Sequence, residues 1–127
     1  MPVLLKRAYE APSTDDGERY LVERLWPRGV AKKDLALTAW LRDIAPSTEL
    51  RKWYGHVEER WPEFAKRYES ELAAPDKQKI LTDLAQKARG GNVTLVFATR
   101  VAELSGAKVL KDVVESLEIQ PSRTHGV

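Results

Sequence analysis

The segment Val93-Thr-Leu-Val-Phe-Ala98 constrains the fold of this chain more than any other part of the sequence. It is short, apolar and rich in β-branched residues, which is typical of a strand covered on both faces. Helical patterns lie on either side of it in the sequence, at residues 77–88 and 104–117. A buried strand between helices predicts an α/β fold, in which helices cover a small and mostly parallel sheet.

Two further strands are predicted near the N-terminus. Residues 2–9 alternate, with Val3 and Lys6 on opposite sides of the strand. Residues 20–26 form a mostly apolar run that stops at a Pro-Arg-Gly turn. Residues 10–19 have the composition of a loop, and their number is close to the minimum for a parallel crossover. The sequence therefore does not decide whether these two strands are joined by a parallel crossover or form a hairpin. Together with the strand at residues 93–98, they give a sheet of three or more strands.

Four helices are predicted between the second strand and the strand at residues 93–98. Their apolar residues recur at helical spacing, and their ends carry capping signals such as the Ser47 hydroxyl and Gly55. The predicted ranges are 35–44, 48–54, 59–72 and 77–88. The predicted fold is thus a mostly parallel sheet with a helical insertion between its second and third strands.

The composition predicts one domain and excludes several kinds of site. A chain of 127 residues with 43% hydrophobic and 31% charged residues is typical of a single globular domain. We assign this domain to residues 3–118 and expect residues 119–127 to form a loose tail. With no cysteine and only two histidines, the sequence has no disulfide or thiolate zinc site, and we expect neither a metal nor a cofactor.

Hydropathy and charge indicate the compartment and the class of partner. The apolar runs are far shorter than the ~20 residues needed to span a bilayer, and the N-terminus lacks the pattern of a signal peptide. We therefore expect a cytoplasmic protein with no membrane partner. The 21 basic and 19 acidic side chains are nearly balanced. This balance argues against nucleic acid as the main partner without excluding it.

Arginines follow or end the predicted strands. Arg7 lies in the first strand, Arg24 and Arg28 at the end of the second, and Arg100 after the last. The carboxyl ends of parallel strands meet at one edge of a sheet, where ligands bind in such folds. Arg7 and Arg24 occur within apolar strand sequences, where an unpaired charge is costly, so each needs an anionic partner. That partner is either an internal carboxylate, such as that of Glu71, or a bound anion.

These residues lead to the hypothesis of a pocket for a phosphate-bearing small molecule or a nucleotide, with aromatic walls. The predicted anion-binding residues are Arg7, Arg24, Arg28, Arg51, Arg67 and Arg100. The predicted wall residues are Tyr9, Trp26 and Trp53, and the catalytic candidates are Tyr9, Ser47 and His56. Glu23 interrupts the second strand, and we expect its carboxylate to pair with a group other than Arg7 or Arg24.

Other interpretations of the same residues stay open. The aromatic residues at helical spacing between positions 40 and 68 are typical of a core, and Trp26 can anchor its turn in that core. The sequence contains no glycine-rich phosphate loop, dinucleotide fingerprint or His-Glu-x-x-His motif. The alternatives to a ligand pocket are a nucleic-acid-binding or regulatory module, and a structural or protein-interaction domain whose arginines are all paired internally.

Two long motifs stand out in the sequence. They are Tyr20-Leu-Val-Glu-Arg-Leu-Trp-Pro-Arg-Gly-Val30 and Ile44-Ala-Pro-Ser-Thr-Glu-Leu-Arg-Lys-Trp-Tyr-Gly-His56. Both resemble the YeaO-like group of the domain-of-unknown-function family 488, and the similarity extends over residues 3–117. The resemblance implies a compact α/β domain with a parallel core sheet, a helical insertion and a shortened connection between the first two strands. It implies no known activity.

The residues characteristic of that family occur here at Arg7, Tyr9, Arg24, Trp26, Pro27, Arg28, Gly29, Ser47, Arg51, Trp53, His56, Arg67 and Tyr68. Similar sequences typically have an acidic residue and an Asn or His after the last strand, where this chain has Thr99-Arg-Val-Ala-Glu-Leu-Ser-Gly106. If relatives use this stretch to supply a general base or a metal ligand, this chain has lost that group. Some similar sequences are labelled MarR-type regulators, but the predicted strand order does not provide a winged helix.

Overall fold

The computed structural model describes residues 3–119, which form a parallel sheet with helices packed on it. The strands are β1 (Val3–Arg7), β2 (Glu18–Leu21), β3 (Ala39–Trp40) and β4 (Val93–Phe97). The helices are α1 (Lys32–Leu35), α2 (Thr48–Tyr54), α3 (Trp61–Leu72), α4 (Pro75–Gly90) and α5 (Gly106–Ile119). The predicted α/β class is confirmed.

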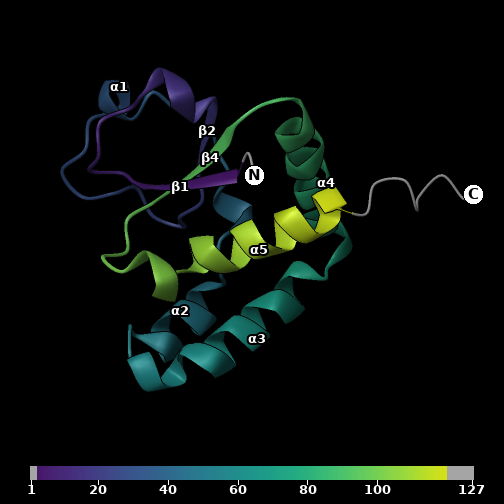
Figure 1. Ribbon diagram of the computed structural model, residues 1–127. Coiled ribbons are helices and arrows are strands. Elements are labelled where there is room, and N and C mark those ends of the chain that lie inside the picture. The colour runs from purple at the N-terminus through teal and green to yellow at the C-terminus, as the bar shows by residue number, and fades with distance from the viewer. Residues whose placement is uncertain (1–2, 120–127) are drawn as a thin grey trace, which may run out of the picture.

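The strand predicted at residues 93–98 lies in the interior of the sheet, whose strand order is β1-β4-β2-β3 (Figure 1). β4 pairs in parallel with β1, where Val3 lies opposite Val93, and in parallel with β2, where Tyr20 lies opposite Leu95. The first two strands are therefore parallel, although they do not pair with each other, and a hairpin between them is excluded. Because every pairing is parallel, all the carboxyl ends lie along one edge of the sheet.

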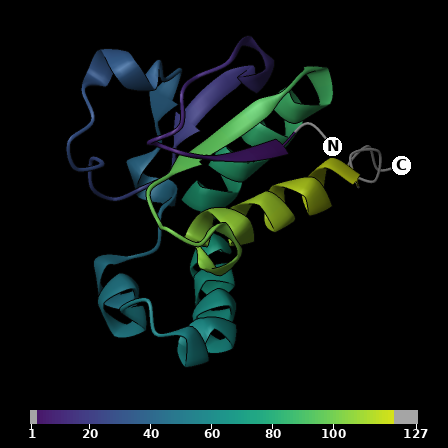
Figure 2. The ribbon, with the colours of Figure 1, turned by 60° about the vertical axis from the view of Figure 1, so that its left-hand side comes forward.

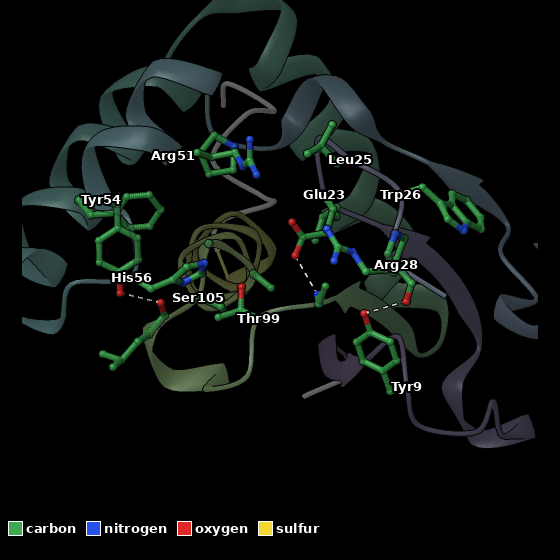
Figure 3. A pocket seen from close by; sticks show the side chains of 18 residues that line it. Tyr9, Glu23, Leu25, Trp26, Arg28, Arg51, Tyr54, His56, Thr99 and Ser105 are labelled. Atoms are coloured by element: carbon green, nitrogen blue, oxygen red, sulfur yellow. Dashed lines mark hydrogen bonds between the residues drawn. The ribbon is translucent and has the colours of Figure 1, made fainter. Parts of the chain in front are cut away.

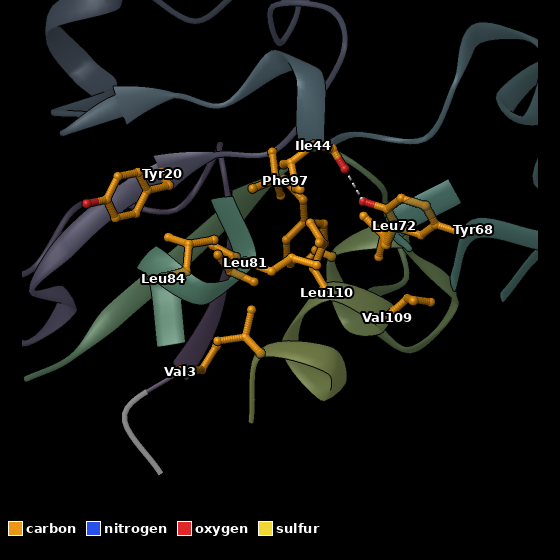
Figure 4. Close-up of a cluster of buried hydrophobic side chains, with 14 of the residues drawn as sticks. Val3, Tyr20, Ile44, Tyr68, Leu72, Leu81, Leu84, Phe97, Val109 and Leu110 are labelled. Carbon is orange, nitrogen blue, oxygen red and sulfur yellow. Dashed lines mark hydrogen bonds between the residues drawn. The ribbon is translucent and has the colours of Figure 1, made fainter. Parts of the chain in front are cut away.

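One face of the sheet packs against α4 and α5, and α3 packs on α5. Val3 of β1 and Phe97 of β4 point to this face, because alternate residues of a strand point to the same side. Leu81 and Leu84 of α4 and Leu110 of α5 cover them and are almost fully buried (Figure 4). Burial of such side chains contributes about 1.5–3 kcal/mol each and is the main source of stability.

The opposite face is covered by the chain between β2 and β3, which includes α1 (Figure 2). Leu21 and Val96 point to this side, and Leu35 of α1 packs against them. Trp26 and Trp40 pack against this smaller cluster with their ring centroids 5.4 Å apart. Since every residue of β4 is buried, the prediction of a strand covered on both faces is confirmed.

A buried ionic cluster fixes the connection between β1 and β2. The Asp16 carboxylate lies 2.6 Å from Arg19 Nη1 and 3.0 Å from Lys6 Nζ, and it accepts a hydrogen bond from the Ser13 amide. The Asp16 carbonyl accepts a hydrogen bond from Thr94 Oγ1 of β4. Burial raises the pKa of Asp16, but these hydrogen bonds outweigh that effect and hold the pKa below its ordinary value. The cluster attaches the connection between β1 and β2 to the sheet. This connection is a crossover that contains no α-helix.

Gly17 brings this connection into close contact with the residue before β4. Its φ is +64°, and a Cβ at this position would lie 2.0 Å from the Asn92 carbonyl oxygen. Glycine is required here both by the left-handed backbone and by the lack of space.

The prediction of a helix over residues 35–44 is wrong. This segment contains the end of α1, the short strand β3 and a turn of 3-10 helix. The amides of Thr38 and Leu41 donate to the carbonyls of Arg19 and Leu21, so pairing with the open edge of β2 outweighs the helical spacing. The helices predicted as an insertion after the second strand therefore follow β3, as α2, α3 and α4.

The strand predicted over residues 20–26 ends at Leu21. The Val22 amide still donates to the Val96 carbonyl, and beyond this bond the chain leaves the sheet. Arg24 and Trp26 therefore lie in an irregular segment that follows the strand rather than inside it.

The other helices agree with the predictions within a few residues. The Ser47 hydroxyl accepts a hydrogen bond from the Leu50 amide at the start of α2, and Gly55 ends this helix with a φ of +51°. Pro62 lies in the first turn of α3. In the described part of the chain, no helix combines the length and the apolarity that a membrane span requires. The predicted loose tail lies outside the described residues, apart from Ile119, which ends α5.

We expect Gly17→Ala to destabilise the fold by at least about 2 kcal/mol, because the new Cβ collides with backbone and the positive φ is strained. Gly29→Ala is the matched control, since Gly29 has a φ of +78° but a Cβ there would meet no atom within 4 Å. It should cost about 1 kcal/mol from the backbone alone. Urea unfolding followed by circular dichroism measures both, and equal losses would contradict this explanation.

The lowered pKa of Asp16 predicts a loss of stability in acid. A carboxylate whose folded pKa lies below its unfolded pKa stabilises the fold above the unfolded pKa, and this contribution is lost as the pH falls through the folded pKa. Asp16→Asn should therefore lower the free energy of unfolding at pH 7, and its difference from the parent protein should shrink towards pH 3. A difference of the same size at both pH values would show that the charge of Asp16 is not what stabilises the connection.

Candidate functional site

A cavity of about 320 Å³ opens at the carboxyl ends of the strands. Its walls come from the segments that follow β1, β2 and β4, from α2 and the residues after it, and from the start of α5. Figure 3 shows Glu23, Arg28, Arg51 and His56 around this space. Parallel sheets bind their ligands at this edge.

Glu23 lies inside the cavity, close to the end of β4. Its Oε2 accepts a hydrogen bond of 2.8 Å from the Ala98 amide, which joins the segment after β2 to the segment after β4. Burial raises the pKa of Glu23, and the hydrogen bond from Ala98 and the positive charges of Arg51 and His56 oppose part of this rise. As expected, Glu23 pairs with neither Arg7 nor Arg24.

Two arginine side chains line the cavity without a partner. Within residues 3–119, the guanidinium groups of Arg28 and Arg51 form no hydrogen bond and no ion pair. Arg28 is exposed on the turn after β2, and Arg51 is half-buried on α2. A guanidinium group offers several donors in a planar fork that matches a carboxylate or a phosphate. The two side chains reach the cavity from different elements and are free to bind an anion there.

Arg7 and Arg24 find their partners in backbone carbonyls rather than in carboxylates. Arg7 donates to the carbonyls of residues 98–99 over 3.3 and 3.1 Å, and Arg24 donates to those of residues 45–46 over 2.9 and 3.3 Å. In the described part of the chain neither arginine forms an ion pair, so both keep their net positive charge. They hold two backbone segments that border the cavity. The expected partner of each arginine was an internal carboxylate or a bound anion, and the structure shows backbone carbonyls instead.

The first turn of α5 forms another wall of the cavity. Ser105, Gly106 and Ala107 line it. The Ser105 amide donates to the Ala102 carbonyl and the Lys108 amide donates to Ser105, so within the described residues the amides of Gly106 and Ala107 are the donors left at this helix start. These amides carry the positive end of the helix dipole. A Cβ at Gly106 would lie 3.2 Å from Pro46 Cγ and 3.3 Å from Tyr68 Cε2, so glycine lets the start of α5 approach these residues closely.

The apolar wall is built from aromatic side chains. The rings of Tyr54 and Phe64 stack with their centroids 4.3 Å apart, and the Tyr54 hydroxyl donates to the Leu104 carbonyl over 2.9 Å. Tyr9 and Leu25 also line the cavity and are 51% and 62% exposed. They form a rim that a ligand or a partner can cover.

Within residues 3–119, no two of the three catalytic candidates are hydrogen-bonded to each other. The Tyr9 hydroxyl donates to the Arg28 carbonyl over 3.2 Å. Ser47 Oγ donates to a Glu71 carboxylate oxygen over 2.6 Å and also caps α2, so it serves the fold. His56 lines the cavity with a left-handed φ of +60°. In the same residues, no group of three or more His, Cys, Asp or Glu side chains could hold a metal ion.

Six of the predicted site residues do not line this cavity, and besides Arg7, Arg24 and Ser47 they are Trp53, Arg67 and Arg100. Arg67 pairs with Glu63 over 2.8 Å and lies 4.4 Å above the ring of Trp53, so both belong to the surface of α2 and α3. Arg100 lines an adjoining hollow together with Thr99. Among the predicted residues, the cavity brings together Tyr9, Trp26, Arg28, Arg51 and His56.

Sequence analysis did not place Glu23 or the start of α5 in the site. For Glu23 a signal existed, because an acidic residue that interrupts an apolar run must find a polar partner inside the fold. For Ser105 and Gly106 no comparable signal existed, since their place in the cavity depends on how α5 packs against the segment at Pro46.

Glu23→Gln should stabilise the protein at pH 7. The amide keeps an oxygen that can accept the Ala98 hydrogen bond but carries no charge to bury. Because the folded pKa of Glu23 is raised, the parent protein loses stability as the pH rises through its unfolded and folded pKa values, so the gain should disappear in acid. Urea unfolding at pH 7 and at pH 4 measures this, and a variant that is less stable at pH 7 would contradict it.

Comparisons with known proteins show which family and which relatives the chain is similar to. A family model described as the inactive DUF488-N3 subclade (DUF488-N3i) matches residues 2–124. Rv3073c, an uncharacterised protein of Mycobacterium tuberculosis, is 44% identical over 108 residues, which are 85% of this chain and 89% of the relative. YeaO, an uncharacterised protein of Escherichia coli, is 41% identical over 119 residues, which are 92% of this chain and 100% of the relative. No solved structure matches the chain at a significant level.

Proposed function

The chain belongs to the DUF488 family, in the subclade described as inactive DUF488-N3, and we propose that it binds a small anionic ligand in the cavity at the carboxyl ends of its strands. The ligand class is a phosphate-bearing small molecule, which includes mononucleotides. The observation that carries this proposal is that Arg28 and Arg51 line one cavity with no partner in residues 3–119. Two free guanidinium groups facing one space favour an anion.

Two further features support an anion. The first turn of α5 adds backbone donors and the positive end of a helix dipole to the same cavity. Arg7 and Arg24 lie against neutral carbonyls at its border, so their charges add to the positive potential. Glu23 is the opposing charge in the cavity, and burial makes its ionised form costly.

The proposed role is binding rather than catalysis. The description of the family as an inactive subclade supports it. The hydroxyl groups of Tyr9 and Tyr54 donate to backbone carbonyls, which do not act as bases, and Ser47, which donates to the Glu71 carboxylate, is not part of the cavity lining. His56 remains as a donor that can contact the ligand.

We further propose that residues 3–118 work as one domain in the cytoplasm. The two apolar clusters that support this lie on the two faces of the same sheet. A sequence without cysteine gains no stability from an oxidising compartment.

Arg51→Ala and Arg28→Ala should each weaken the binding of a phosphate compound by about 1–3 kcal/mol, because each removes a charge-assisted hydrogen bond. Isothermal titration calorimetry with inorganic phosphate and adenosine monophosphate gives the affinities, and the intrinsic fluorescence of the four tryptophans, one of which is Trp26 in the cavity lining, follows the same titrations. Arg42→Ala is the matched control, since it removes the same charge from an arginine that lies 4.3 Å over Trp40, outside the cavity lining.

Binding that is unchanged in folded Arg28→Ala and Arg51→Ala variants would contradict the proposed site. A short single-stranded oligonucleotide, titrated at two salt concentrations, tests the alternative of a nucleic-acid-binding module. Binding to the oligonucleotide alone, with a steep loss at high salt, would favour that alternative. No response to any of these probes would favour a domain without a small ligand.

A further inference from the structure

The cavity contains a carboxylate beside its positively charged groups. The binding of a simple anion does not explain why a carboxylate lies there. Glu23 lines the same space as Arg28, Arg51 and His56 (Figure 3). The positive charge of Arg51 acts on it through space, but no ion pair joins Glu23 to either arginine in the described part of the chain. A negative charge in this place repels a bound phosphate, which weakens the binding of any ligand that is only an anion.

The free oxygen of Glu23 is available to a ligand. Oε2 is used by the Ala98 amide, whereas Oε1 accepts no hydrogen bond within residues 3–119. The hydrogen bond from Ala98 also fixes where the carboxylate lies, because Ala98 directly follows the buried strand β4. A fixed carboxylate with one free oxygen is a good acceptor for an ammonium group.

From this arrangement, and on the basis of the proposed function, we infer that the ligand is a small phosphorylated amine. Its phosphate is bound by Arg28, Arg51 and the first turn of α5, and its ammonium group is bound by Glu23. A ligand of this kind brings its own positive charge to the carboxylate and its own negative charge to the guanidinium groups, so it pairs both kinds of charge that the cavity contains.

The size and the walls of the cavity fit such a ligand. A volume of about 320 Å³ is at the small end of the range for ligand pockets. It accommodates a metabolite of a few heavy atoms more readily than a dinucleotide. The ring of Tyr54 lies in the wall beside the charged residues, and an aromatic ring is a favourable neighbour for an ammonium group.

Two probes that differ only in the amine test this inference. Phosphoethanolamine carries a phosphate and an ammonium group, and 2-hydroxyethyl phosphate carries a hydroxyl in place of the amine. Calorimetry at pH 7 compares their affinities, together with that of inorganic phosphate, for the parent protein and for Glu23→Gln. Glu69→Gln is the control variant, because it makes the same change of charge at an exposed position of α3 outside the cavity.

We expect the parent protein to bind phosphoethanolamine at least tenfold more tightly than 2-hydroxyethyl phosphate. Glu23→Gln should weaken the binding of phosphoethanolamine by tenfold or more and leave unchanged or strengthen the binding of inorganic phosphate, because it removes a repulsive charge. Glu69→Gln should change neither. Circular dichroism and urea unfolding check that Glu23→Gln is folded.

The inference is overturned if the parent protein does not prefer the amine, or if Glu23→Gln strengthens the binding of both organic phosphates alike. In either case, binding that still depends on Arg51 would leave the proposed anion site standing. If the parent protein binds none of the three phosphate compounds, the proposed function itself fails, and this inference fails with it.

Discussion

The fold depends on the burial of one strand on all sides. β4 is covered by α4 and α5 on one face and by Leu35 of α1 on the other, and its two edges pair with β1 and β2. A backbone polar group in such a place must find its partner within the sheet. Both neighbouring strands run parallel to β4, so the segments after three strands converge at one edge. The cavity lies there because of this arrangement.

The arginines near this edge divide into two kinds. Arg7 and Arg24 are bound to carbonyls of segments that border the cavity, and they give the site its shape. Arg28 and Arg51 have no partner in residues 3–119 and are available for a ligand. All four keep their charge, because a neutral carbonyl does not cancel that of a guanidinium group. In the proposed anion site, Arg7 and Arg24 hold the surrounding backbone in place before a ligand binds, and Arg28 and Arg51 supply the free charges.

Much of this fold follows from patterns in the sequence that report local structure. The buried strand at residues 93–98 and the capped helix after Ser47 have signals within a few residues of themselves, and both are found. The segment at residues 35–44 has helical spacing but lies along the open edge of β2, where pairing between distant residues decides its structure. That competition cannot be seen from the segment alone.

The structure brings together only some of the residues that the sequence predicted for a site. Strand order and direction place Arg28 near the carboxyl ends of the strands, and they place the turn containing Trp26 at the same edge of the sheet. The exclusion of Arg67 depends on a local pair with Glu63 across one turn of α3, which leaves it on the outer surface. The inclusion of Gly106 depends on the close packing of α5 against Pro46, a contact between distant parts of the sequence.

The most direct test of the central claim is a map of the backbone amides that respond to a bound anion. A titration of the isotope-labelled protein with inorganic phosphate, followed by nuclear magnetic resonance, reports each amide separately. The account predicts saturable shifts at the first turn of α5, at Ala98 and at Glu23, all of which line the cavity. Shifts confined to the surface around Trp53 and Arg67, or no saturable shift at all, would contradict an anion site at the carboxyl ends of the strands.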